Sequence, residues 1–159
     1  MAKKIIGIKK WSLLVVFLIA YSNIYSQSQE DIVDYLKNRI ELYSQRPTTL
    51  EVNNCKLKIQ LEMSIPGSPS YITELNCSLK NLTDVMYVNE RQPWITLKFK
   101  NKDVSYTDIE QNGTKKLWKY DDDISLFFSK GTINENETKK LAELFKKLGK
   151  NCGAKILDF

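Results

Sequence analysis

The spacing of apolar positions changes along the chain and divides it into helical and extended parts. From residue 29 to residue 43, apolar side chains recur every three or four residues, with Ile32, Leu36 and Ile40 on one face. This spacing predicts an amphipathic helix. Ser28, three residues before Asp31, has the type and position of an N-cap residue. We therefore expect a helix over residues 29–43.

A period of two follows in the stretch CKLKIQLEM, where apolar residues alternate with polar ones from Cys55 to Met63. Such alternation is typical of a strand with one buried and one solvated face. The turn sequence IPGSPS then leads into a second strand, so the two are expected to form a hairpin. Strands are predicted at residues 55–63, 71–79, 85–88, 94–100, 104–110, 115–120 and 124–129.

The helical period returns near the C-terminus, in the stretch NENETKKLAELFKKLGK. Leu141, Leu144, Phe145 and Leu148 share one face there, and lysines occupy the other. The order of one helix, about seven short strands and one helix predicts an α+β fold. We expect an antiparallel bent sheet, or partly open barrel, capped by the C-terminal helix.

This layout resembles the pleckstrin-homology-like barrel, in which the final helix plugs one end of a bent sheet. The segments DIVDYLKNRI, CSLKNLTDVMYV and LFKKLGKNCGAKILDF resemble those of small secreted bacterial proteins of uncharacterised function with this layout. The resemblance implies a fold and no particular activity, because one fold serves many functions. Phosphoinositide-binding members carry basic residues around the first hairpin loop, whereas SIPGSPSY has none, so this ligand is not expected.

Residues 1–26 are predicted to be a signal peptide. Lys3, Lys4, Lys9 and Lys10 accompany the apolar stretch 11–20, and small residues follow at two cleavage positions, after Ser26 and after Ser28. A positive head, an apolar middle and a small-residue exit form a secretory signal. The apolar run is also shorter than the roughly 18–20 residues that span a bilayer. We expect a secreted or periplasmic protein with a single domain at residues 27–159; the alternative is a retained N-terminal anchor.

Removal of this segment changes the meaning of the charge. The whole chain carries 24 basic and 19 acidic residues, a net charge of +5, which by itself favours nucleic acid or an anionic membrane as a partner. Without the four N-terminal lysines, 20 basic residues face 19 acidic ones and the net charge is near +1. We therefore expect no nucleic-acid partner, and no stable membrane insertion after cleavage.

The chain contains no histidine. This excludes imidazole acid–base catalysis, Ser–His and Cys–His nucleophiles, and His-ligated zinc. The acidic cluster from Asp121 to Asp123 is interpreted as a solvated turn between strands. We expect no catalytic residue, no cofactor and no metal; an enzyme that uses only carboxylates or tyrosine is a minor alternative.

Three cysteines follow the signal segment: Cys55, Cys77 and Cys152. In an exported protein, an odd number suggests one disulfide and one free thiol. If the first hairpin turns at Pro66, then Cys55 and Cys77 lie opposite each other, so a Cys55–Cys77 disulfide is one interpretation. The others are three reduced, buried cysteines, or a bridge that involves Cys152.

The expected function is that of a non-catalytic binding domain for an unknown protein or cell-surface component. Such barrels often bind peptides along a sheet edge or beside the C-terminal helix, here the strand 94–100 or the helix 136–148. The proposed partner surface consists of Trp94, Lys98, Lys100, Tyr120 and Phe127. The alternative is a carrier of a small apolar ligand, in a lipocalin-like or helix-grip cavity. That cavity would be lined by Leu57, Ile59, Leu61, Ile95, Leu97 and Phe99.

Overall fold

The computed structural model describes residues 28–129 and 131–156, so the predicted signal peptide lies outside the described residues. Two helices enclose the strands in sequence: α2 (Gln29–Tyr43) and α3 (Glu135–Asn151). The strands are β1 (Thr48–Asn53), β2 (Lys56–Met63), β3 (Tyr71–Ser78), β4 (Leu82–Val88), β5 (Trp94–Phe99), β6 (Val104–Ile109), β7 (Lys115–Asp121) and β8 (Asp123–Phe127), with a 3₁₀ turn η1 (Leu79–Asn81) before β4. The predicted α+β class is confirmed, with eight strands in place of about seven.

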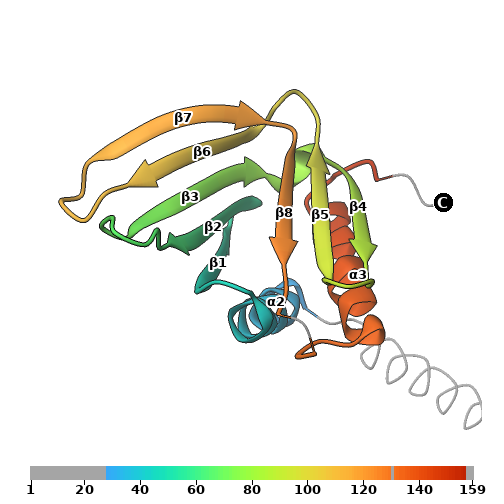
Figure 1. Cartoon of the computed structure of the whole chain (residues 1–159). Helices are drawn as coiled ribbons and strands as arrows, with labels where there is room; N and C mark the ends of the chain where they lie inside the picture. The colour runs from blue at the N-terminus through green and yellow to red at the C-terminus, as the bar shows by residue number, and fades with distance from the viewer. Residues whose placement is uncertain (1–27, 130, 157–159) are drawn as a thin grey trace, which may run out of the picture.

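The strands form two antiparallel sheets that do not close into a barrel. The larger has the order β1-β2-β3-β6-β7, and the smaller has the order β4-β5-β8. Figure 1 shows the β2–β3 and β6–β7 hairpins projecting away from the body, while the smaller sheet stands beside α3. Helix α3 packs on β4, and α2 packs on β1 and α3. One end of the larger sheet is therefore covered, and the other extends beyond the helices.

The first helix begins where the sequence predicts, because Ser28 caps it. The Ser28 hydroxyl accepts a hydrogen bond from the Asp31 N–H (3.0 Å), and the Asp31 carboxylate accepts one from the Ser28 N–H (3.0 Å). This reciprocal pair satisfies two N–H groups that a helix start leaves without partners. Ile32, Leu36 and Ile40, the predicted apolar face, are fully buried.

Strand β1 is absent from the sequence prediction, which left residues 48–53 unassigned. β1 and β2 form a tight hairpin, in which Asn53 lies opposite Lys56 and only Asn54 and Cys55 form the loop. Both loop residues have positive φ, 49° and 60°. A two-residue hairpin loop of this kind is usually recognised by a glycine, and here a cysteine stands in that place. Because residue 55 is not a glycine, the sequence did not indicate this turn, and strand β1 before it was not predicted.

The core is filled by side chains from both sheets and both helices. Phe145 and Leu148 of α3 are fully buried there, as is Leu50 of β1. Burial of a side chain of this size contributes about 1.5–3 kcal/mol. Five of the six residues expected to line a ligand cavity belong to this core and are at most 3% exposed: Leu57, Ile59, Ile95, Leu97 and Phe99. That cavity prediction is wrong, because the alternating apolar faces pack against α2, α3 and each other.

The predicted Cys55–Cys77 disulfide is also wrong. The bridge joins Cys55 to Cys152, with a Cα–Cα distance of 5.6 Å, and Cys77 is a buried free thiol. In the β2–β3 pairing, Leu57 lies opposite Cys77. The hairpin is thus centred one residue beyond Pro66. Cys55 belongs to the preceding turn, from which its side chain reaches the end of α3.

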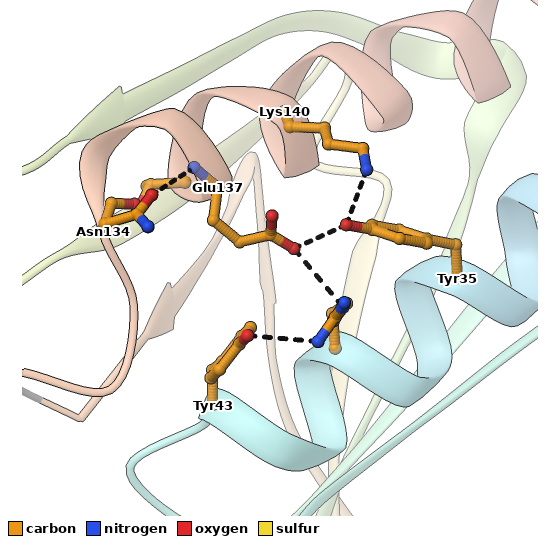
Figure 2. A network of polar contacts seen from close by, with 7 residues as sticks. Tyr35, Tyr43, Asn134, Glu137 and Lys140 are labelled. Carbon is orange, nitrogen blue, oxygen red and sulfur yellow. Dashed lines mark hydrogen bonds and ion pairs between the residues drawn. The ribbon is translucent and has the colours of Figure 1, made fainter.

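A network of polar side chains joins the two helices (Figure 2). Glu137 of α3 accepts a hydrogen bond from the Tyr35 hydroxyl (2.7 Å) and lies 3.4 Å from the Arg39 guanidinium of α2. Lys140 donates to the same Tyr35 hydroxyl at 2.8 Å, and Arg39 donates to the Tyr43 hydroxyl at 3.2 Å. Every member already has a partner in the other helix or its own, so we interpret the network as a structural clamp.

Candidate functional site

The inner face of the larger sheet is covered over only part of its length. Leu57 and Ile59 of β2 are fully buried, whereas Leu61 and Met63, further along the same face, are partly exposed. A half-open cleft of about 400 Å³ lies there, between the larger sheet and β8. We call it the intersheet cleft; it is lined by Ser44, Gln45, Arg46, Thr48, Leu61, Met63, Tyr71, Thr73, Tyr106, Asp108, Trp118, Ser125, Leu126 and Phe127. Its size lies in the range of ligand pockets.

Aromatic side chains dominate the exposed part of this lining. Trp118 is 52% exposed and Phe127 is 47% exposed. Phe127 packs against Trp94, with ring centroids 6.2 Å apart, and Trp118 meets Tyr106 edge-on at 5.5 Å. Large aromatic rings left in water are typical of binding surfaces, since their burial supplies much of the energy of association. The cleft thus offers aromatic surface that the fold itself leaves uncovered.

Fixed hydrogen bonds hold the polar groups of the cleft in place. The Thr73 hydroxyl donates to Asp108 at 2.8 Å, and the Tyr106 hydroxyl donates to the carbonyl oxygen of Asp123 at 3.0 Å. Burial raises the pKa of Tyr106, and the negative charges of Asp121 and Asp123 raise it further. The phenol therefore stays protonated and keeps its bond to β8, which ties the two sheets together across the cleft.

Strand β8 turns one backbone edge toward the cleft. Along the β5–β8 pair, every second residue of β8 bonds to β5. Two bonds show which residues these are: Phe128 N–H donates to the Pro93 carbonyl, and Phe99 N–H donates to the Asp122 carbonyl. Residues 124 and 126 consequently direct their backbone groups to β5, and residue 125 directs its groups to the other side. On this side the Phe127 carbonyl already accepts a hydrogen bond from the Gln45 N–H, and the Asp123 carbonyl accepts one from the Tyr106 hydroxyl. The backbone N–H and C=O of Ser125, which lines the cleft, lie between these two bonds and are the groups that remain to pair with an entering chain.

A β-bulge next to the cleft brings together residues that the sequence analysis kept apart. The β6–β7 register shifts between Tyr106 and Thr107. As a result, the consecutive residues Trp118 and Lys119 both contact the Tyr106 ring. Strict alternation would have placed them on opposite faces, so the pattern of apolar positions could not reveal this cluster. The one available signal was the sequence KKLWKY, which interrupts the alternation with an aromatic residue between lysines.

A second hollow, of about 840 Å³, lies on the opposite face of β2, where Gln60 and Glu62 contribute to its lining. Its polar side chains are partly engaged across the strands: Gln60 donates to Glu74 at 2.9 Å, and Lys58 pairs with Glu51 at 2.6 Å close by. Cross-strand pairs of this kind stabilise a sheet surface. We therefore take the intersheet cleft, with its uncovered aromatic rings, as the candidate site.

The predicted partner surface is brought together only in part. Trp94 and Phe127 lie opposite each other in the β5–β8 pair, and Lys98 follows on the same face of β5. Lys100 lies beyond the end of β5, at the turn into β6. Tyr120 pairs with Ser105 in the β6–β7 register and is 60% exposed. Of the five residues of the predicted partner surface, Phe127 lines the intersheet cleft; Trp118 and Tyr106, which also line it, were not part of that prediction.

The two segments considered for peptide binding, the strand 94–100 and the helix 136–148, do not expose the edge or the apolar face that a peptide would use. Strand β5 pairs with β4 on one side and β8 on the other, so it has no free edge. The apolar face of α3 is buried, including Leu141 and Phe145. Strand addition is instead restricted to the outer strands of the two sheets, which are β1 and β7 in one and β4 and β8 in the other. The outer edge of β8 is partly occupied, because Phe127 and Ser129 bond to the backbone of residues 43–45 there.

The acidic cluster forms the corner between β7 and β8, as the sequence suggested. Asp121 ends β7 and Asp123 begins β8. A hydrogen bond from the Lys119 ammonium, together with one from the Asp122 N–H, lowers the pKa of Asp121. Within residues 28–129 and 131–156, no group of three or more potential metal-ligating side chains comes together.

Comparison with family models, curated proteins and solved structures found no match for the chain. The resemblance to secreted proteins with a pleckstrin-homology-like barrel therefore stays a prediction. None of the helices among the described residues has the length and apolar character needed to cross a membrane.

Proposed function

We propose that the protein is a secreted or periplasmic, non-catalytic binding domain whose intersheet cleft receives an extended segment of a partner protein. The observation that carries the proposal is the cleft of about 400 Å³ with Trp118 and Phe127 exposed in its lining. Tryptophan is enriched among the residues that dominate protein–protein binding energy, and phenylalanine is enriched with it in the cores of protein interfaces.

Two further features support an extended segment as the ligand. The backbone of Ser125 on the outer strand β8 lies beside the cleft, and an entering chain can pair with this one residue, a short form of strand addition. The cleft lining also alternates aromatic rings with polar groups, among them Thr73, Asp108 and Arg46. Such a lining suits a chain with side chains of both kinds.

Export is supported by the Cys55–Cys152 disulfide. Disulfides form and persist mainly in oxidising compartments, such as the periplasm and the extracellular space. This agrees with the signal peptide predicted for residues 1–26. The first experiment on this point is the mass of the protein recovered from a bacterial host, which we expect to begin at Gln27 or Gln29.

The proposed function is tested by binding to an array of random twelve-residue peptides. Phe127→Ala should weaken the strongest peptides by tenfold or more, on the order of the loss of a central aromatic contact. Tyr120→Ala is the matched control, because Tyr120 is as exposed and aromatic but does not line the cleft. Equal losses in both variants, or peptides indifferent to Phe127→Ala, would contradict the proposal.

A carrier of a small apolar ligand is the second candidate, because the cleft volume also suits a small molecule. Native mass spectrometry separates the two functions. A bound mass that disappears on denaturation, and that Phe127→Ala removes, would favour the carrier. A bare polypeptide mass together with Phe127-dependent peptide binding would favour the partner segment.

A further inference from the structure

Lys119 occupies a corner formed by two aromatic rings and a carboxylate at the edge of the intersheet cleft. Its ammonium nitrogen lies 4.3 Å from the centroid of the Tyr106 ring and 5.0 Å from that of Trp118. It also forms an ion pair with the carboxylate of Asp121. Aromatic faces and a carboxylate around an ammonium group are the elements by which proteins recognise alkylammonium ligands. We call these three residues, without Lys119, the cation corner.

The corner is held by bonds that do not involve Lys119. The Tyr106 hydroxyl is bonded to the Asp123 carbonyl, and the Asp121 carboxylate accepts a bond from the Asp122 N–H at 2.9 Å. The rings of Tyr106 and Trp118 contact each other directly. These contacts would remain if Lys119 moved away, so the corner is preformed and carries the negative charge of Asp121.

Lys119, in contrast, can leave the corner, although a ligand must then replace its ion pair and its two ring contacts. Lys119 lies on β7, the outermost strand of the larger sheet, and its side chain is 36% exposed. A lysine has a flexible four-carbon stem, and the Lys119–Asp121 ion pair is only partly buried, with side chains 36% and 31% exposed. An ammonium group on a ligand could therefore take its place while Lys119 turns to solvent.

We propose that the cation corner binds a lysine side chain of the segment that enters the cleft, and that Lys119 is its displaceable internal substitute. This inference rests on the proposed function, since the entering segment is the one that binds the cleft. Trp118 belongs to both the corner and the cleft lining. A chain that covers Phe127 can thus reach the corner through the same cleft.

The corner can be tested with Nα-acetyl-lysine methylamide as the probe. NMR follows the indole N–H signal of Trp118, assigned by its loss in Trp118→Phe. The tethered lysine competes at an effective concentration in the millimolar range, so Lys119→Ala should bind a probe of millimolar affinity at least about twofold more tightly than the unchanged protein. Lys116→Ala, which removes the same charge from the same strand, should not.

Three results would overturn the inference. One is equal affinity of Lys119→Ala and the unchanged protein for the probe. A second is equal binding of the uncharged analogue Nα-acetyl-norleucine methylamide. The third is a preference for phosphocholine over the lysine probe, which would assign the corner to a quaternary ammonium headgroup. Asp121→Asn in the Lys119→Ala background should weaken the probe again.

The peptide array separates this inference from the proposed function. If peptides bind through Phe127 but show no preference for lysine, the cleft function stands and the corner assignment fails. If the lysine probe shifts the Trp118 signal while no peptide depends on Phe127, the corner stands as an ammonium site and the proposed function fails. Support for both requires lysine-containing peptides whose binding depends on Phe127 and on Trp118.

Discussion

Reduction of the Cys55–Cys152 disulfide should remove a large part of the stability of the protein. The two cysteines are 97 residues apart in sequence. The loop-entropy relation for a crosslink of that length gives about 16 cal/mol/K, or about 4.7 kcal/mol at 25 °C, as the upper limit of the loss. Domains of this size are stable by about 5–15 kcal/mol in total. We therefore expect a reduced protein that still folds, with a free energy of unfolding lower than that of the oxidised protein by up to about 4.7 kcal/mol.

Urea unfolding with and without dithiothreitol, followed by circular dichroism, measures this difference. Cys55 has a φ of 60°, so two effects on stability meet at this residue: the crosslink and the backbone strain of the turn. A matched variant that removes both cysteines and places glycine at position 55 separates these effects. Glycine adopts this conformation freely, whereas other residues lose about 1 kcal/mol there. Cys55→Gly/Cys152→Ala should thus be about 1 kcal/mol more stable than the reduced, unchanged protein, and less stable than the oxidised one.

Two outcomes would refute this reasoning. A difference below about 1 kcal/mol between oxidised and reduced protein would mean that the bridge does not restrict the unfolded chain as the entropy relation requires. Digestion without reduction provides the second test, because it identifies the linked peptides directly. A peptide pair containing Cys77 would show that the register of β2 and β3, which places Leu57 opposite Cys77, is incorrect.

Two further predictions follow from single positions. Burial raises the pKa of the Cys77 thiol, and the charge of Asp103 raises it further. Iodoacetamide at pH 8 should therefore not label the native protein. It should label one cysteine after denaturation, and three cysteines after denaturation with reduction. Rapid labelling of the native protein would contradict the buried position. Ser28→Ala should lower the free energy of unfolding by about 0.5–2 kcal/mol through loss of the helix cap, whereas Ser28→Asn should change it little; equal losses in urea melts would argue against the cap.

The helices could be predicted from sequence because their determinants are local. The Ser28 cap and the apolar spacing fix α2 at Gln29–Tyr43, and the same spacing identifies α3. Most strand positions were also predicted to within a few residues, because alternation and turn residues are local signals. Strand β1 was missed for the opposite reason, since the turn after it depends on a cysteine held in a conformation that usually indicates glycine.

The register of the first hairpin could not be obtained in this way. A centre at Pro66 would place Cys55 opposite Cys77, whereas the structure places Leu57 there. The two registers differ by two residues, so both keep the same side chains on the inner face. The apolar pattern excludes only a shift of one residue, which moves side chains to the other face. The loop between the strands, residues 64–70, is too long to decide the matter.

The position of the cleft follows from contacts between distant parts of the chain. The disulfide fixes the end of α3 to the β1–β2 turn, and α2 packs on β1, so one end of the larger sheet is covered. The strands of the two long hairpins continue beyond this covered part, as Figure 1 shows. Their inner residues, such as Met63, then have no helix to pack against.

This geometry connects the stability of the fold to the proposed binding site. Closing the cleft would bury Trp118 and Phe127, which the fold leaves about half exposed. Burial of an aromatic side chain is among the largest single contributions to association. The Tyr106 bond to the Asp123 carbonyl ties the two sheets together beside the cleft, and in this arrangement the fold leaves both rings partly in solvent. Under the proposed function, burial of these two rings would contribute to the binding of a partner, and the hydrogen bonds that already order the cleft would lower the cost of binding.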